Sequence, residues 1–427
     1  MLATQELIQE AALPYRLGQL LPRWLREVPL YQRTGASSRL GGEAVSLSDL
    51  RRLPLITKHD IRRDFPRNFL RAGVELEALL DQDLVELEHT SGTSEERMPL
   101  LLGRGWWAEQ EERALRLNPC VASVLDEFPE ARRVTINSPV CSGDICYSGV
   151  PSRADRAVGN ALFVSLSRYP FLWSEAELAR MAAEAVEWQP QFLDMDPVYG
   201  VLFALDCERR GIRLPSLRFI LCSYEFVSVA HRRILERVFG APVFNLYGST
   251  ETGHLLMETG RGEMRLSLET ALLEVLNMDG HGIGELAVTT LTNDFMPLIR
   301  YRIGDLAERD ERPYHTNYIV HGRAADAFVA PDGGRVTTWQ IDRCLADLPG
   351  IAHYQLCERA GGEWLLRFVP DVTAPSAAEI EALRQRLTRL LGVSGALAIQ
   401  QTDLLVPESS GKFRLGYPAM KTTAAAA

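Results

Sequence analysis

The order of hydrophobic and polar positions predicts short buried strands that alternate with amphipathic helices through most of the chain. Apolar runs of strand length occur at 134–136, 219–222 and 243–246. Residues 175–188 instead repeat apolar side chains at helical spacing. Strands and helices in alternation are typical of an α/β architecture.

Two later segments change this pattern. Residues 284–291 alternate with period two, as expected of a half-exposed strand. Beyond Gly322 the sequence restarts with a Gly-rich turn at 332–334, a strand pattern at 364–369 and a helical pattern at 380–390. We therefore expect a β-rich subdomain followed by a small α+β domain.

The length of the chain sets a matching expectation. A single hydrophobic core stops growing at about 250 to 300 residues, whereas this chain has 427 residues, of which 46% are hydrophobic. We predict an α/β fold with a large N-terminal domain over 1–321, made of α/β subdomains and the β-rich subdomain. A small, mobile α+β C-terminal domain over 322–427 should follow it through a short hinge.

Charge and the N-terminal sequence argue against several classes of function. The net charge is −10 and no long run of Lys or Arg is present, so binding to nucleic acid or to an anionic membrane is not expected. The first ten residues lack an apolar signal-peptide core, and no stretch approaches the ~18 apolar residues of a membrane span. We expect a cytoplasmic monomer or homodimer.

The seven cysteines are scattered and odd in number, which favours reduced thiols over a disulfide framework. Cys141 and Cys146 are close in sequence, but no histidine or second cysteine pair accompanies them. Because a structural zinc ion needs four such ligands, buried thiols are the favoured interpretation.

The segment Tyr247-Gly248-Ser249-Thr250-Glu251-Thr252-Gly253 follows directly on an apolar run and gathers hydroxyls, a carboxylate and two glycines. At the end of a strand, such a segment is suited to a nucleotide and its metal ion. Hydroxyls and backbone N–H groups bind phosphate, while the carboxylate binds the cation.

Three other places carry potential chemistry. The loop 89–94 has four hydroxyls and a glycine, so backbone N–H groups can approach phosphate. Asp305 and Arg323 together offer contacts to a ribose diol. Lys412 stands in a small Ser/Gly loop. Each feature alone is also compatible with a solvated turn, a surface ion pair or a solvated lysine.

In their order along the chain, these segments resemble the motifs of the adenylate-forming enzyme superfamily. The matching stretches are TSGT at 90–93, YGSTETG at 247–253, RYRIGD at 300–305, GRAAD at 322–326 and SGKFR at 410–414. LPLITKHDI at 53–61 and MPLIRYR at 296–302 are similar to signatures of the phenylacetate-CoA ligase branch. The resemblance implies that ATP and an aryl or arylacetic acid give acyl-AMP, which a thiol, usually coenzyme A, converts to a thioester.

The resemblance also implies which residues bind the nucleotide. The loop residues Thr90, Ser91, Gly92 and Thr93 would enclose the β- and γ-phosphates. Tyr247 would stack near adenine, and Asp305 would bind the ribose with Arg323 as its partner.

For catalysis, the resemblance implies that Thr250 approaches the α-phosphate and that Glu251 binds Mg²⁺. Lys412 would bridge the substrate carboxylate and the α-phosphate, where a cation stabilises the charge gathered in the transition state. The C-terminal domain would rotate about Asp326 between the two half-reactions. The backbone at Gly333 and Gly334 would then line a coenzyme A tunnel, because glycine permits close approach.

The acid is expected beside the strand-end motif, since its carboxylate must reach the α-phosphate. The resemblance points to Gly248 and to Ser223, Tyr224 and Glu225, with Tyr224 as a candidate for stacking on an aromatic ring. His254 is a candidate partner for an ortho substituent such as the amine of anthranilate, although a histidine outside the pocket is favoured. Benzoate-type acids are slightly favoured over arylacetates.

One stretch departs from the family pattern. The family loop usually continues with a glycine and a lysine, whereas Glu95, Glu96 and Arg97 follow here. Two carboxylates beside a polyphosphate predict weaker ATP binding and leave open a non-catalytic protein that binds acyl-AMP or an aryl acid. Free coenzyme A is the expected acceptor, with a separate acyl carrier protein as the alternative.

Overall fold

The computed structural model describes residues 2–34, 47–90, 97–139, 151–312, 315–359, 362–393 and 397–419. Packing divides the chain into two compact units. The first combines 1–122 with 246–320, and the second combines 123–245 with 321–427. The positions outside the described residues include Ser91, Gly92, Thr93, Glu95, Glu96, Cys141, Cys146 and 424–427.

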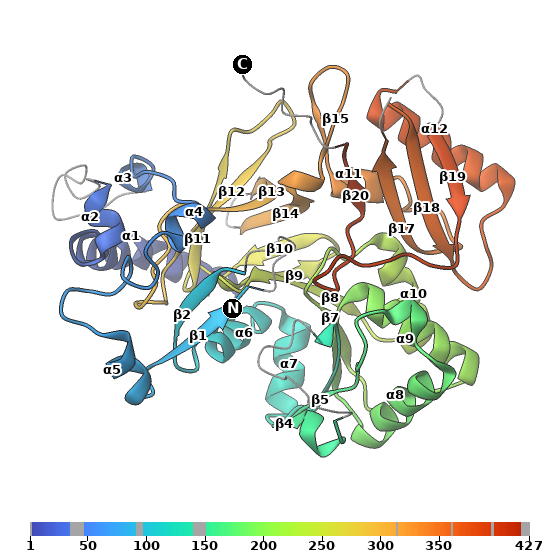
Figure 1. The fold of residues 1–427 in the computed structure, drawn as a ribbon, viewed down its shortest axis with the longest axis horizontal. Coiled ribbons are helices and arrows are strands. Elements are labelled where there is room, and N and C mark those ends of the chain that lie inside the picture. Colours follow the sequence, from blue (N-terminus) through green and yellow to red (C-terminus); the bar gives the residue numbers. More distant parts are fainter. Residues whose placement is uncertain are drawn as a thin grey trace. The chain divides into compact units, whose positions relative to one another are not determined.

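The first unit is built around an antiparallel sheet (Figure 1). In spatial order, its strands are β11 (Ala271–Leu276), β12 (Ile283–Thr290), β13 (Tyr301–Arg312), β14 (His315–Arg323), β10 (Glu263–Leu266) and β9 (Gly253–Gly260). The strand predicted at 284–291 is therefore confirmed as β12. The prediction that one face of this strand is exposed is wrong, because Glu285 is the one residue of β12 that is not buried. Both faces of this strand are covered.

Helices and a hairpin accompany this sheet. They are α1 (Leu2–Glu27), α2 (Pro29–Arg33), α3 (Leu47–Leu50), α4 (Lys58–Arg62), α5 (Leu76–Asp81), β1 (Val85–His89), β2 (Pro99–Gly103) and α6 (Trp106–Leu115). Helix α4 begins at Lys58 because the N–H and hydroxyl of Thr57 bind the Asp60 carboxylate at 2.8 and 2.7 Å. This capping box fixes the direction in which the chain enters the helix. Helix α7 (Pro119–Glu127) leads into the second unit.

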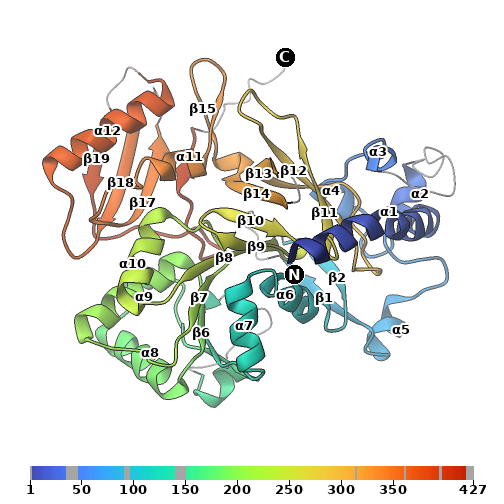
Figure 2. The ribbon, with the colours of Figure 1, turned by 180° about the vertical axis from the view of Figure 1, so that it is seen from behind.

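The second unit contains a mainly parallel sheet. Its strands are, in order, β7 (Phe219–Cys222), β6 (Phe192–Met195), β3 (Arg133–Ile136), β5 (Ala161–Phe163) and the antiparallel β4 (Ala157–Val158). Figures 1 and 2 show α8 (Glu175–Trp188), α9 (Pro197–Arg210) and α10 (Val229–Phe239) packed together beside it. The predicted strands at 134–136 and 219–222 and the helix at 175–188 are confirmed. The loops that follow β3, β6 and β7 leave the same edge of the sheet, where α/β proteins bind ligands.

Strand β8 (Val243–Ser249) takes part in both units. Its first three residues pair in parallel with β7, and from Leu246 onward it pairs antiparallel with β9. The prediction that the strand ends before the YGSTETG motif is therefore wrong. The strand runs through Tyr247 and Gly248 because β9 folds back on it as a hairpin partner.

The C-terminal part of the second unit has its own sheet, with the order β19 (Leu397–Gln401), β18 (Trp364–Pro370), β17 (Ile351–Glu358) and β20 (Gly416–Tyr417). The remaining elements are β15 (Phe328–Val329), β16 (Arg335–Val336), α11 (Thr338–Arg343) and α12 (Ala377–Leu391). Helix α12 starts at a Ser376 capping box and buries Leu383, Leu387 and Leu391. The strand and helix predicted here are confirmed, whereas the boundary at Gly322 and the mobility of 322–427 stay predictions.

Within the described residues, the cysteines are free thiols, as their spacing predicts; they are Cys120, Cys207, Cys222, Cys344 and Cys357. No described helix has the length and apolar character that a bilayer span requires.

Candidate active site

The YGSTETG motif forms the tip of the β8–β9 hairpin, and its two glycines allow the strands to meet. A Cβ on Gly248 would lie 2.2 Å from the carbonyl oxygen of Gly253. A Cβ on Gly253, whose φ is +69°, would lie 2.9 Å from the Trp106 ring. A side chain at Gly248 would force the strands apart, and one at Gly253 would clash with α6, so the glycines fix the turn that carries Thr250 and Glu251.

Glu251 is the carboxylate of this turn, and 6% of its side chain is exposed. Its Oε1 accepts a hydrogen bond from the Tyr301 hydroxyl at 3.0 Å and lies 3.8 Å from the Lys58 ammonium. A nearly buried carboxylate needs compensation of this kind to remain charged. Lys58 is 41% exposed, so its charge also faces solvent.

The residues around Glu251 can be tested against the predicted magnesium ion. Among the described residues, no group of three or more His, Cys, Asp or Glu is placed to hold a metal. Magnesium, however, commonly takes one or two carboxylates and completes its shell with phosphate and water oxygens. Glu251 fits this second arrangement, in which the ion arrives with a polyphosphate.

Arg300 explains how Lys58 reaches Glu251. Its guanidinium binds both oxygens of Glu274, at 2.9 and 3.1 Å, and donates to two carbonyl oxygens of the segment before α4. The backbone of Ile56 bonds to β13 on both sides, at 3.2 and 2.9 Å. The two signature stretches of the sequence are therefore joined, and α4 presents Lys58 toward the hairpin.

Two residues predicted to contact the nucleoside are neighbours. The Tyr247 hydroxyl donates to Asp305 Oδ2 at 2.6 Å, across β8 and β13. Asp305 is 6% exposed, and the hydrogen bond fixes the plane of its carboxylate. Their contacts with adenine and ribose stay predictions.

Two other predicted residues make local contacts in the first unit. The Thr90 hydroxyl accepts the N–H of Met98 at 3.0 Å, so this side chain is bound to the start of the following strand segment. The His254 ring lies 4.8 Å from the ring of Trp107. Phosphate binding by Thr90 and acid binding by His254 stay predictions.

In the second unit, residues 223–225 form a tight turn after β7. The Glu225 N–H donates to the Ser223 carbonyl at 2.9 Å, across Tyr224 with a φ of +73°. This is the strained form of the γ-turn. The hydroxyls of Ser223 and Tyr224 lie 3.1 and 3.4 Å from the two oxygens of Asp194, a buried residue of β6. These bonds hold a backbone conformation that costs about 1–3 kcal/mol. Acid binding by these residues stays a prediction.

The loop that carries Lys412 is bound through its backbone. Three side chains donate to consecutive carbonyl oxygens: Arg168 to Ser409 at 3.1 Å, Ser138 to Ser410 at 3.4 Å, and Tyr199 to Gly411 at 3.1 Å. Lys412 itself is partly exposed. The loop is thus docked on the end of the parallel sheet while its lysine remains accessible.

The remaining predicted residues lie in the C-terminal part. Arg323 ends β14, and Asp326 forms an ion pair with Arg414 at 2.6 Å. Gly333, with a φ of +82°, and Gly334 form the exposed turn between β15 and β16. Their roles as ribose partner, hinge and tunnel stay predictions.

A buried histidine pair joins α10 to β17. His231 Nε2 and His353 Nδ1 are 3.0 Å apart, and the Ser228 N–H donates to His231 Nδ1 at 3.3 Å. His231 therefore carries its proton on Nε2 and donates it to His353. Burial lowers the pKa of His231 to about 3, and burial together with His231 lowers the pKa of His353. Both rings are neutral near pH 7.

Replacing His353 by glutamine is expected to reduce the loss of stability in acid. The unfolded chain takes up protons below pH ~6.5 while the buried pair does not, so the free energy of unfolding falls as pH drops. On going from about pH 7.5 to about pH 4.5, the free energy of unfolding of H353Q should rise by about 2 kcal/mol relative to that of the wild type. Urea denaturation at each pH measures it.

H353Q must be compared with the wild type at each pH because other groups also change the stability with pH. Burial raises the pKa of Asp196 and of Asp342 to about 6, and this favours the folded state in acid. His59 is exposed on α4, so H59Q serves as the matched control. A constant difference for H353Q would contradict a neutral buried pair.

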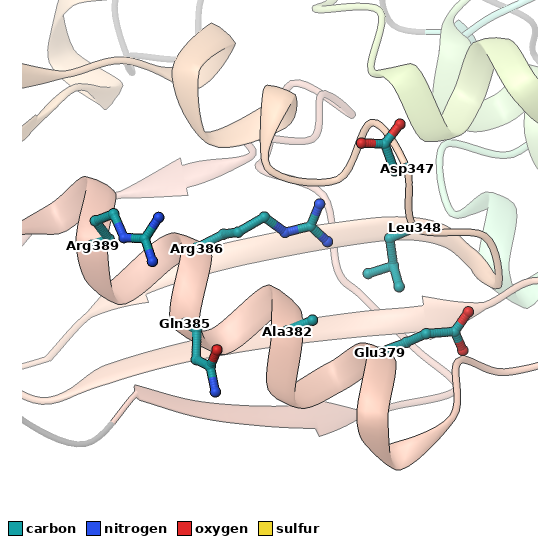
Figure 3. A pocket seen from close by; sticks show the side chains of 7 residues that line it. All are labelled: Asp347, Leu348, Glu379, Ala382, Gln385, Arg386 and Arg389. Carbon is teal, nitrogen blue, oxygen red and sulfur yellow. The ribbon is translucent and has the colours of Figure 1, made fainter.

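A hollow of about 370 Å³ lies between α12 and the loop before β17 (Figure 3). Its walls are Asp347 and Leu348 of the loop and Glu379, Ala382, Gln385, Arg386 and Arg389 of α12. It contains none of the predicted site residues. Its mixed charges favour no ligand of a single sign.

Two residues were not predicted from the sequence: Lys58, which lies beside Glu251, and Asp196, the buried residue that caps α9. For Lys58, a signal was available in the composition. Of the 46 basic side chains, only three are lysines, at positions 58, 412 and 421. In a chain that otherwise uses arginine, the first two lysines stand in motif segments and lie near carboxyl groups, Lys58 near Glu251 and Lys412 near Glu225.

No family model matches the chain. The sequence is 25% identical to the phenylacetate-coenzyme A ligase of Escherichia coli, over 93% of this chain and 92% of that protein. The likeness thus spans nearly the whole of both proteins. The chain is phenylacetate-CoA ligase-like along nearly its whole length. The branch suggested by LPLITKHDI and MPLIRYR is confirmed.

Solved structures agree with this placement of the phenylacetate-CoA ligase-like chain. A 2-hydroxyisobutyryl-CoA ligase in the postadenylation state matches with a TM-score of 0.66 at 19% identity, over 95% of this chain and 88% of that one. The anthranilate CoA ligase AuaEII, in complex with anthranoyl-AMP, matches with a TM-score of 0.53 at 13% identity, over 77% and 65%. They confirm a mixed α/β fold with a large N-terminal and a smaller C-terminal domain.

Proposed function

We propose that the chain is an AMP-forming acid-thiol ligase. It converts an aromatic carboxylic acid, of the benzoate, anthranilate or arylacetate type, to acyl-AMP and then to a thioester with coenzyme A. The full-length likeness to a phenylacetate-coenzyme A ligase carries the proposal. The two similar structures are ligases for an aliphatic and an aromatic acid, so the fold alone does not select the ring.

The proposed roles follow from the contacts within each unit. Tyr247 and Asp305 orient the nucleoside, and their mutual hydrogen bond preorganises them. Thr250 and Glu251 face the phosphates from a turn that two glycines make rigid. Mg²⁺, when bound with ATP, would neutralise phosphate charge beside Glu251. Lys412 would stabilise the charge that gathers as the acid carboxylate approaches the α-phosphate.

In this proposal, Lys58 replaces the lysine that the loop 91–96 lacks. Its ammonium is 3.8 Å from Glu251 and partly exposed, so it can move from this carboxylate to a phosphate. We expect Lys58→Met to lower kcat/KM for ATP by about 10-fold, on the scale of one charge-assisted hydrogen bond. Initial rates at varied ATP concentration measure the effect.

The matched control for Lys58 is Arg63→Met, because Arg63 is an exposed cation next to the same short helix. It should change kcat/KM for ATP by less than twofold. Equal losses in both variants would mean that the local net charge matters and that the position of Lys58 does not.

The function itself is tested by ATP-pyrophosphate exchange with a panel of substituted benzoates, phenylacetates and aliphatic acids, including 2-hydroxyisobutyrate. Aromatic acids should support the fastest exchange. Exchange with aliphatic acids alone would overturn the aromatic class, and no exchange with any acid would favour the non-catalytic alternative. Thioester formation is then compared between coenzyme A and a holo-acyl carrier protein; preferential loading of the carrier would overturn coenzyme A as the acceptor.

A further inference from the structure

A buried carboxyl group, that of Asp196, and a half-buried one, that of Glu225, face the lysine loop from adjacent strand ends of the parallel sheet. Asp196 follows β6 and caps α9, accepting the N–H groups of Val198 and Tyr199 at 2.9 and 3.3 Å. It is 2% exposed. Glu225 follows β7 and the strained turn at Tyr224, and its carboxyl group is hydrogen-bonded to that of Asp196.

Glu225 also binds the loop directly. Its Oε1 accepts the backbone N–H of Phe413, the residue after Lys412, at 2.6 Å. The Phe413 ring is 5% exposed. It packs against the rings of Phe171, His353 and Tyr199, at centroid distances of 5.5, 5.3 and 6.3 Å. The neighbour of Lys412 is therefore fixed through both its backbone and its side chain.

The electrostatics of the pair couple the two carboxyl groups to each other and to Lys412. Burial and the adjacent Asp196 carboxylate raise the pKa of Glu225 well above its ordinary value. Burial also raises the pKa of Asp196, while the α9 N–H groups and Lys412 favour its charged form. The protonation of the two carboxyl groups is therefore coupled, and the positive charge of Lys412 favours the charged form of each.

We propose that Glu225, supported by Asp196, is a positioning residue for Lys412. Its carboxyl group holds the loop at Phe413 in the docked conformation, and the negative charge of the pair attracts the ammonium toward the sheet edge. The strained turn at Tyr224 is what aims Glu225 at the loop. The inference rests on the proposed role of Lys412, but the anchor is a property of the loop that can be measured without turnover.

The anchor is tested by amide hydrogen exchange of peptides covering 408–415 in the full chain. Glu225→Ala removes the acceptor, so exchange should accelerate at least ~10-fold, on the scale of one hydrogen bond to a carboxyl group. Glu225→Gln keeps an acceptor oxygen of the same reach and should stay within about threefold of wild type. Unchanged exchange in Glu225→Ala would overturn the proposal.

Asp342 provides a matched control. It is a buried carboxylate that likewise accepts a backbone N–H, from Val229 at 2.9 Å, but it belongs to α11. Asp342→Ala should lower the melting temperature while exchange at 408–415 changes less than about threefold. Acceleration there equal to that of Glu225→Ala would overturn a specific anchor, because any loosening of the C-terminal part would then suffice.

In Glu225→Ala, the first half-reaction should slow more than the second. Pyrophosphate release with the preferred acid should fall about 10- to 30-fold in Glu225→Ala and recover in Glu225→Gln. Thioester formation from supplied acyl-AMP and coenzyme A should fall clearly less than pyrophosphate release does. Equal losses in both steps would mean a merely structural role and overturn the proposal. A wild type that releases no pyrophosphate refutes the ligase function, whereas the exchange result still decides the anchor.

Discussion

Replacing Lys412 by alanine is expected to slow pyrophosphate release by about 10²- to 10³-fold, the scale of losing one preorganised stabilising group. Two anions, the acid carboxylate and the α-phosphate, must approach each other in the first half-reaction. A fixed ammonium between them stabilises the charge without reorganisation. Among the described residues, no other lysine lies in the C-terminal part of the chain. Single-turnover release with the preferred acid gives the rate directly.

The control for Lys412→Ala is Lys421→Ala, which removes the remaining lysine of the C-terminal part and should leave the rate within about twofold. Thioester formation from supplied acyl-AMP should also persist in Lys412→Ala, because this step does not join two anions. Pyrophosphate release within threefold of wild type would remove Lys412 from the mechanism.

Gly411→Ala is expected to slow pyrophosphate release by about 100-fold by displacing the lysine loop. The new Cβ would lie 2.1 Å from the Ser138 hydroxyl oxygen, 2.9 Å from the Ser138 Cβ and 3.3 Å from the Tyr199 hydroxyl. In addition, the φ of Gly411 is +84°, a conformation that costs an L residue about 1–2 kcal/mol. The loop cannot relieve both the steric clash and the backbone strain without losing its contacts with the sheet edge.

Two further variants separate the clash from the backbone strain. Gly211 ends α9 with a φ of +67° and has open space around its position, so G211A carries strain without a clash and should keep near-normal rates. Ser138→Gly, combined with Gly411→Ala, removes the obstructing side chain and should restore most of the lost rate. No recovery in the double variant would contradict the steric account.

Single helices and strands of this fold can be predicted from the sequence because each one depends on the residues within it and at its ends. Helix α8 repeats apolar residues at helical spacing after a Ser174 cap, and β7 is a continuous apolar run between polar turns. Strand β12 shows the limit of such reading. Its period-two pattern predicts one exposed face, yet the polar Thr289 and Thr290 are buried because their hydroxyls accept backbone N–H groups of the next segment.

The contacts of the candidate site are harder to predict from the sequence because they join residues that are far apart along the chain. The motifs identify Glu251 and Lys412, but not the partners that hold them. Lys58 reaches Glu251 through Arg300, which binds segments about 250 positions apart in the sequence. No local pattern encodes that pairing. Glu225 is an instructive case, since its motif suggested contact with the acid and its described contact is with the Phe413 backbone.

The scarcity of lysine has a practical consequence. A reagent that modifies primary amines meets three side chains in this protein, and two of them, Lys58 and Lys412, belong to the proposed machinery. The many arginines that keep the surface charged do not react with it. Amine reagents, which label many surface lysines on most proteins, would here modify two residues of the proposed machinery and one other lysine side chain. Amine-reactive probes can therefore be used to follow Lys58 and Lys412 with little background from other side chains.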